Sequence, residues 1–127
     1  MFTRLMASVA GLLIAPPAFA APPDFDRDVV PILASRCLDC HTGEDGKGGV
    51  DLARHSSVVG PQRSVVPGRP DQSLLWKKVV ANEMPPKKPL PEKEKAILKD
   101  WIAGGAKWCT DPVDPFAITT GSRAGRN

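Results

Sequence analysis

The sequence lacks most features that would place its 127 residues in a membrane, on nucleic acid or in a disulfide scaffold. Its N-terminal apolar run, residues 5–15, is shorter than the roughly 20 residues that cross a bilayer. No later stretch is apolar enough or long enough to cross one. The 17 basic and 14 acidic residues give a net charge of only +3, which gives no reason to expect nucleic acid as a partner. Two of its three cysteines lie three positions apart and the third, Cys109, far downstream, a spacing that a disulfide framework explains poorly.

The first 20 residues predict a signal peptide. Arg4 supplies a positive start, an apolar run follows, and Ala18 and Ala20 are the small residues that a signal peptidase reads. We expect cleavage after Ala20, export to the periplasm and no transmembrane segment in the mature chain; an uncleaved anchor helix is the alternative. Loss of Arg4 leaves 16 basic against 14 acidic residues, a mature charge of +2.

The mature chain predicts an all-α domain over residues 21–108. Its many prolines and glycines leave a small hydrophobic core, which indicates that something additional is buried. Apolar residues spaced as in a helix follow Asp24 and Asp26, either of which is a candidate cap, and Pro31 is expected to shorten or bend this helix.

Two further helices are predicted downstream. One has Asp71 as its N-cap and stops before Pro85; the other has Pro91 at its first position and ends at the Gly104-Gly105 pair. Residues 42–70, rich in Gly, Pro and Ser, predict a long loop that needs a ligand to wrap. Residues 109–127 are expected to be a tail or linker, disordered in solution.

The motif with the clearest chemistry is Cys37-Leu38-Asp39-Cys40-His41. Cysteines at this spacing on one helix face are placed to add to the two vinyl groups of one haem, and the adjacent histidine to bind its iron. A thioredoxin-like thiol pair needs no such histidine. A zinc site would need a fourth ligand, for which only His55 and Cys109 remain, neither in a paired spacing. The motif therefore predicts one covalently bound haem c, with Cys37, Cys40 and His41 as its residues.

Met84 is the candidate for a second iron ligand. Met1 and Met6 leave with the signal peptide, and Pro85 and Pro86 stiffen the chain that presents the Met84 thioether. The alternative role is filling a gap in the core. His55, in the flexible loop, is interpreted as a surface residue rather than a ligand.

Charge is distributed unevenly along the mature chain. Residues 24–51 carry seven acids and three bases, whereas 52–107 carry eleven bases and five acids. The lysines on either side of Met84 suggest a docking surface for an acidic redox partner, with a merely solvated face as the alternative. These lysines are Lys77, Lys78, Lys87 and Lys88. Trp76 and Trp101 are expected in the core.

Four phrases in this order resemble the planctomycete-type cytochrome c module, over residues 24–108. They are PDFDRDVVPILASRCLDCHTG, GGVDLARHSSVV, PGRPDQSLLWKKV and EMPPKKPLPEKEKAILKDWIAGGAKW. The resemblance implies a small monohaem cytochrome c fold of about three helices, with Cys37 and Cys40 as thioether residues, His41 as proximal and Met84 as distal ligand. In that family the module commonly begins a longer exported protein, and Cys109 is outside the pattern.

Two functions follow as hypotheses. The first is an electron carrier, not an enzyme, whose six-coordinate iron passes single electrons to a redox protein partner. The second is a haem enzyme or sensor with an open sixth site, for which only His55 offers an acid or base. The chain is also interpretable as the front electron-transfer module of a larger enzyme. Its oligomeric state is not indicated.

Overall fold

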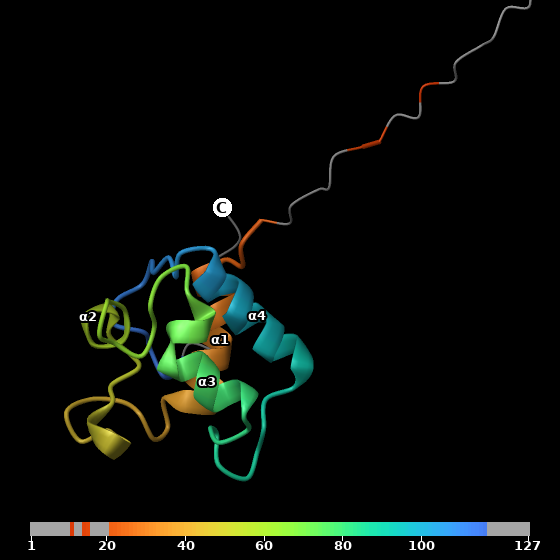
Figure 1. The fold of residues 1–127 in the computed structure, drawn as a ribbon. Helices are drawn as coiled ribbons and strands as arrows, with labels where there is room; N and C mark the ends of the chain where they lie inside the picture. The colour runs from red at the N-terminus through yellow and green to blue at the C-terminus, as the bar shows by residue number, and fades with distance from the viewer. Residues whose placement is uncertain (1–10, 12–13, 16–20, 117–127) are drawn as a thin grey trace, which may run out of the picture.

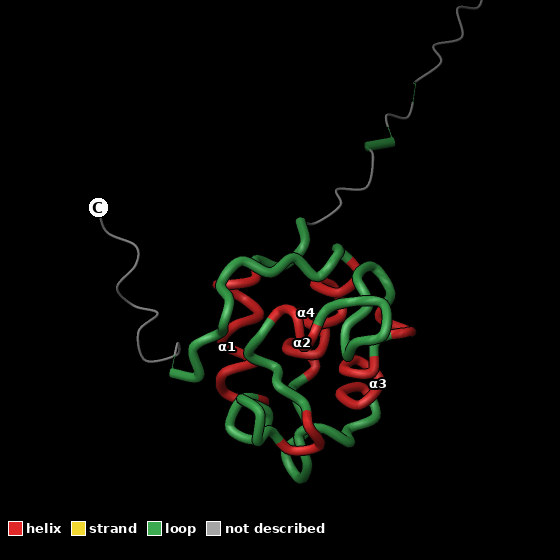
Figure 2. The backbone as a smooth tube through the Cα atoms, turned by 90° about the vertical axis from the view of Figure 1, so that its left-hand side faces the viewer, coloured by secondary structure: helices red, strands yellow, loops and turns green. Residues whose placement is uncertain are grey.

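The computed structural model describes residue 11, residues 14–15 and residues 21–116. In this part of the chain, helices and turns surround one core, and the only strand-like pairing is a single bridge between Val59 and Val65 (Figures 1 and 2). The predicted all-α class is confirmed. The predicted signal peptide and its cleavage point lie almost entirely outside the described residues. Among the residues described, no helix has the length and apolar character to cross a membrane.

The first helical stretch runs from Phe25 to Cys37 and delivers the cysteine motif. It consists of α1 (Val30–Ile32) between two π-helical segments, Phe25–Val29 and Leu33–Cys37. We refer to the whole of residues 25–37 as the N-terminal helix. Three further α-helices follow: α2 (His55–Val58), α3 (Leu74–Val80) and α4 (Glu92–Ala103). Short 3-10 turns at Lys47–Gly49 and Pro70–Gln72 interrupt the long loop.

Asp24 determines where the N-terminal helix starts, and Pro31 determines the hydrogen-bond pattern in its middle. The Asp24 carboxylate accepts a hydrogen bond from the Arg27 backbone N–H at 2.8 Å, so Asp24 is the cap. Pro31 has no N–H to donate, and wider π-type turns lie on both sides of it. The helix therefore continues through Pro31 with a changed hydrogen-bond pattern.

The predicted starts of α3 and α4 need correction. Ser73, not Asp71, is the N-cap of α3, because Asp71 belongs to the preceding 3-10 turn. The buried Ser73 hydroxyl accepts from the Val66 N–H at 2.9 Å and donates to the Arg69 carbonyl at 2.8 Å, so it fixes the loop that enters α3. Pro91 is the N-cap of α4, so this helix begins at Glu92, one residue later than predicted.

The end of α4 is a Schellman motif, as its glycine pair predicted. The Ala106 N–H donates to the Trp101 carbonyl at 2.9 Å, and the Gly105 N–H to the Ile102 carbonyl at 3.0 Å. Gly105 has φ of 107°, a conformation that glycine adopts without a steric penalty. Gly104 is required for a different reason, since a Cβ there would lie 2.7 Å from Cβ of Pro22.

Three aromatic rings join the N-terminal helix to α4. Phe25 and Trp101 are 2% and 1% exposed, with ring centroids 5.7 Å apart, and Trp108 lies 4.4 Å from Phe25. The indole N–H of Trp101 donates to the Lys107 carbonyl at 2.8 Å, so its polar atom is satisfied inside the core. The predicted core position of Trp101 is confirmed, whereas Trp76 is only partly buried.

The packed unit extends beyond residue 108, where the sequence placed the domain boundary. Val113 is 2% exposed, and its N–H donates to the Ala53 carbonyl at 2.7 Å. Asp111 accepts from the His55 N–H at 3.0 Å. Residues 109–116 therefore include a segment that packs over the loop before α2, because a buried valine stabilises it there. Residues 117–127 lie outside the described part.

Replacement of Phe25 by Ala tests the aromatic junction. We expect the free energy of unfolding of the haem-loaded protein to fall by about 3–5 kcal/mol, because a buried ring leaves a cavity between two helices. Denaturant titration followed by circular dichroism measures this. Lys107→Ala is the matched control, since it changes only an exposed side chain beside the same cluster. Equal stability of the two variants would contradict the role of Phe25.

Candidate functional site

The cysteine motif lies where the N-terminal helix ends. The Leu38 N–H still donates to Leu33, after which the N–H groups of Cys40 and His41 both donate to the Cys37 carbonyl, at 3.3 and 3.1 Å. The chain therefore turns tightly around one carbonyl. Cys37 is buried, Cys40 is exposed, and neither is in a disulfide. Both thiols are thus free for other chemistry.

The loop that follows the motif is bonded back onto it. The Lys47 N–H donates to the Cys40 carbonyl and the Leu52 N–H to the His41 carbonyl, each at 2.8 Å. The Thr42 hydroxyl donates to the Leu38 carbonyl. These bonds fix the backbone of Cys40 and His41 from both directions along the chain, which limits the conformations open to the two side chains.

The helix end is also tied to α4. Arg36, directly before Cys37, donates from Nε and Nη2 to the two carboxylate oxygens of Glu94, at 3.0 and 3.1 Å. This two-bond geometry raises the pKa of Arg36. Both side chains are partly exposed, so solvent screens the pair and weakens its contribution to stability. Its main effect is to set the position of Cys37 relative to α4.

The side chain of His41 has an unsatisfied atom. Its Nδ1 is buried and has no hydrogen-bond partner among the described residues. A buried polar atom without a partner costs about 1–3 kcal/mol, so the imidazole is not committed to the protein's own hydrogen-bond network. An imidazole in this condition fits the role of an iron ligand.

Met84 lies in the loop after α3 and is 39% exposed. Its backbone N–H donates to the Lys78 carbonyl at the end of α3, at 3.2 Å. A methionine that fills a core gap is expected to be buried, so the exposure disfavours that alternative. Met84 is therefore not committed to the hydrophobic core.

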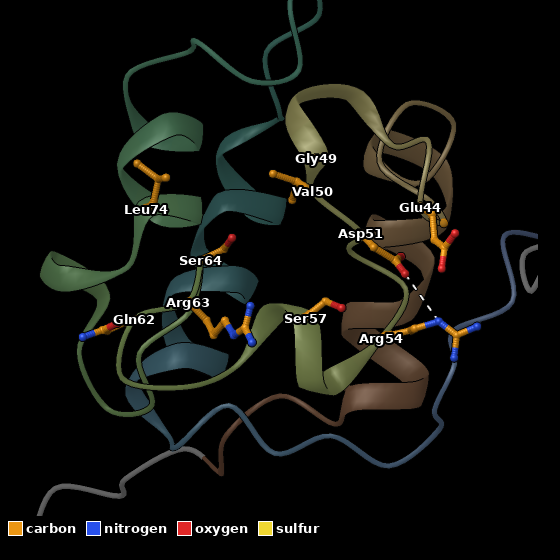
Figure 3. Close-up of a pocket in the computed structure, with 11 residues that line it drawn as sticks. Glu44, Gly49, Val50, Asp51, Arg54, Ser57, Gln62, Arg63, Ser64 and Leu74 are labelled. Carbon is orange, nitrogen blue, oxygen red and sulfur yellow. Dashed lines mark ion pairs between the residues drawn. The ribbon is translucent and has the colours of Figure 1, made fainter.

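A cavity of about 610 Å³ opens beside the motif. Its lining begins two residues after His41, at Gly43 and Glu44, and continues through the loop before and after α2 to Leu74 of α3. Figure 3 shows Leu74 on one side and Val50 and Asp51 on the other. The volume lies within the roughly 300–1,000 Å³ typical of small-molecule and cofactor sites. Leu74, an apolar residue of this lining, is 54% exposed.

The sequence did not predict this cavity. None of the four predicted site residues, Cys37, Cys40, His41 and Met84, lines it. The arginines that do, Arg54 and Arg63, come from the loop in which no helical or strand periodicity marks inward-facing positions. Arg54 forms an ion pair with Asp51 at 3.4 Å, so part of the positive charge at the cavity wall is neutralised.

The competing chemistries of the motif fit the structure less well. Burial, and to a smaller extent the Glu94 carboxylate, raises the pKa of the Cys37 thiol to about 11. Thiol redox sites instead depend on a lowered pKa, which generates the thiolate. A structural zinc site needs four ligands, and no group of three or more His, Cys, Asp or Glu residues that could hold a metal occurs in the described ranges.

A comparison with known families decides what the motif belongs to. Residues 37–88 match the model of the family described as Planctomycete cytochrome C. This segment is a planctomycete-type cytochrome c module. The match begins at Cys37 and includes Met84, so both predicted ends of the haem site fall within it. No curated protein and no solved structure matches the chain significantly.

Residues 37–88 are thus similar to haem-binding electron carriers of the cytochrome c type, and the described part of the chain has a small helical fold. Its donor set fits that cofactor: two free thiols, an uncommitted histidine and an accessible thioether, which are the groups used for covalent haem and iron ligation. The N-terminal helix and α4, which lie mostly or wholly outside the matched segment, pack together in the core of the same unit.

The remaining predicted residues have structural surroundings of their own. His55 is exposed, and its ring meets the edge of Trp108 at 5.8 Å, in agreement with a surface role. Cys109 is exposed and free. The ammonium group of Lys99 lies 5.9 Å from the centre of the Trp76 ring, so that ring is partly covered by a cation.

Proposed function

We propose that the protein is an exported monohaem c-type cytochrome that binds haem c covalently and transfers single electrons between redox partners. The observation that carries the proposal is the Cys37–His41 motif: free thiols and an uncommitted imidazole, at a helix end, inside a segment that matches a cytochrome c family. Export follows from the N-terminal signal pattern of residues 1–20.

Each residue of the site has a distinct role in this proposal. Cys37 and Cys40 would hold the haem covalently, each by addition of its S–H across one vinyl group, so attachment needs no oxidant. His41 and Met84 would hold the iron. Haem supplies the one-electron change between ferrous and ferric iron, and Met84 favours the ferrous state relative to histidine or water in its place.

The thioether bonds predict that haem stays with the denatured chain. After export in cells with a cytochrome c maturation system, the polypeptide band of a denaturing gel should stain for haem, because covalent bonds survive unfolding. The double variant Cys37→Ala/Cys40→Ala should lose the stain, whereas Cys109→Ala should keep it. A wild-type band without haem would refute covalent attachment.

The ligand role of Met84 predicts six-coordinate, low-spin iron without an open site. Met84→Ala should lower the reduction potential and open the ferrous iron to carbon monoxide, while covalent haem is retained, because only the axial bond is lost. The oxidised unmodified protein should show the weak sulfur-to-iron absorption band near the red edge of the visible, and Met84→Ala should not. Potentiometry measures the reduction potential, and stopped-flow spectroscopy measures the rate of carbon monoxide binding.

His55→Ala is the control for that experiment, since it alters the only other histidine besides His41. It should change neither the absorption band nor carbon monoxide binding. If the unmodified protein lacks the band and its ferrous form already binds carbon monoxide rapidly, the sixth site is open. The haem enzyme or sensor then becomes the better function.

The lysines around Met84 form the docking surface of this proposal. Lys77, Lys87 and Lys88 are exposed, whereas Lys78 is engaged with Glu83 in an ion pair. These lysines lie close to Met84 in the sequence, and Met84, the proposed ligand, is itself partly exposed. Positive charge around such a site steers an acidic redox protein toward it.

Reversal of three charges tests the docking surface. Lys77→Glu/Lys87→Glu/Lys88→Glu should slow electron exchange with an acidic redox protein about tenfold or more at low salt and flatten its salt dependence, because steering is lost. Lys78 is left intact to preserve its pair with Glu83. Lys93→Glu is the control, because it reverses one charge at an exposed position of α4 that is not among the docking lysines. Unchanged rates in the triple variant would show that partners dock elsewhere.

A further inference from the structure

A buried lysine lies next to the loop that carries Met84. Lys95 of α4 is 7% exposed, and among the described residues only Ser73 is also a buried polar or charged side chain. Its Nζ donates to Oδ1 of Asn82 at 2.8 Å and to Oε1 of Glu92 at 3.0 Å. Burial of an ammonium group is unfavourable unless it is paired, so these two acceptors determine where the side chain lies.

The two acceptors of Lys95 are not equivalent. Glu92 is one turn earlier on α4 and its side chain is 89% exposed, so solvent weakens this pair. Asn82 lies on another segment, 13 residues earlier, just beyond α3. The bond to Asn82 is therefore the one through which Lys95 connects α4 to the rest of the chain. It crosses to the loop that joins α3 and α4 (Figure 1).

Asn82 is the turning point at the end of α3. Its φ is 58°, a left-handed conformation that asparagine tolerates better than most residues. The Asn82 N–H donates to the Val79 carbonyl at 3.1 Å, and the Glu83 N–H to the Lys78 carbonyl at 2.9 Å. This is a Schellman motif with asparagine in the position that glycine usually occupies. A glycine there would offer no side chain for Lys95.

Met84 follows this motif directly. Its N–H shares the Lys78 carbonyl with Glu83, at 3.2 Å. The backbone of Met84 is thus set by the geometry of the α3 end, two residues from the amide that Lys95 holds. A change in the orientation of Asn82 would move the hydrogen-bonded turn and the thioether together.

We propose that Lys95 is a positioning residue for the Met84 ligand. Through Asn82 it locks the end of α3 and keeps the thioether where the iron requires it, so it sets the strength of the sixth ligand bond without touching the haem. This rests on the proposed function, in which Met84 is that ligand. The positioning role explains why a lysine is buried at a helix face that an apolar residue would fill at lower desolvation cost.

Substitutions on both sides of the bond test the proposal. Lys95→Leu removes the donor without introducing a second thioether, and Asn82→Gly removes the acceptor while it retains the left-handed backbone. In each haem-loaded variant the sulfur-to-iron band should weaken, the potential should fall, and carbon monoxide should bind ferrous iron roughly tenfold faster, the effect of one hydrogen bond to a charged group. Asn82→Asp keeps an acceptor and should preserve the unmodified behaviour.

Two controls separate positioning from general damage. Lys93→Leu makes the same chemical change at an exposed site of α4 and should leave all three readouts unchanged. Circular dichroism and covalent haem content establish that each variant is folded, and Asn82→Gly replaces Lys95→Leu as the deciding variant if the latter does not fold.

The outcomes distinguish this proposal from the function on which it rests. If Met84→Ala alters the band and carbon monoxide binding but Lys95→Leu and Asn82→Gly match the unmodified protein, Lys95 has only a structural role and the proposal is overturned. If Met84→Ala also matches the unmodified protein, Met84 is not the ligand, and both the assignment and the positioning role are wrong.

Discussion

The contact between the N-terminal helix and α4 determines the rest of the structure. Phe25 packs on Trp101 with both rings nearly inaccessible, and this contact fixes the two helices relative to each other. α4 then contacts both ends of the candidate site through consecutive residues. Glu94 pairs with Arg36 beside the cysteine motif, and Lys95 bonds Asn82 beside Met84. The segments that carry His41 and Met84, which are distant in the sequence, are thus both bonded to the same helix.

The sequence predicted those parts of the fold that local chemistry specifies. Helical periodicity, an acidic cap before the first helix and the glycine pair after α4 each act within a few residues, and the structure contains all three, with Asp24 as the cap where the sequence left Asp24 and Asp26 open. The cap of α3 was misassigned to Asp71 because both Asp71 and Ser73 suit an N-cap, and only the backbone bend decides between them. Val113 was missed because a lone valine among prolines has no period, and its burial depends on contact with Ala53.

The candidate site likewise combines features that the local sequence specifies with features that depend on tertiary contacts. The motif at Cys37 and the elimination that led to Met84 are local or compositional, so they were accessible from the sequence. The cavity beside the motif and the buried amine of Lys95 arise from segments brought together by folding. A lysine in an amphipathic helix is ordinarily interpreted as a solvent-facing residue, and nothing in its neighbourhood marks Lys95 as different from Lys93.

The exposure of Leu74 and Met84 and the unpaired nitrogen of His41 all mark groups that the described polypeptide leaves without a partner. Within the residues described, apolar side chains remain in contact with water and the buried Nδ1 of His41 has no hydrogen-bond partner. A cofactor that covers these groups adds to stability only when it binds the folded chain, because it has no equivalent site on the unfolded one. The polar bonds from Glu94 and Lys95 of α4 contribute separately, since they are formed by the polypeptide itself. In a domain with so small a core, the helices therefore fix the positions of the predicted ligands, and a haem bound there would supply the apolar contacts that the polypeptide lacks.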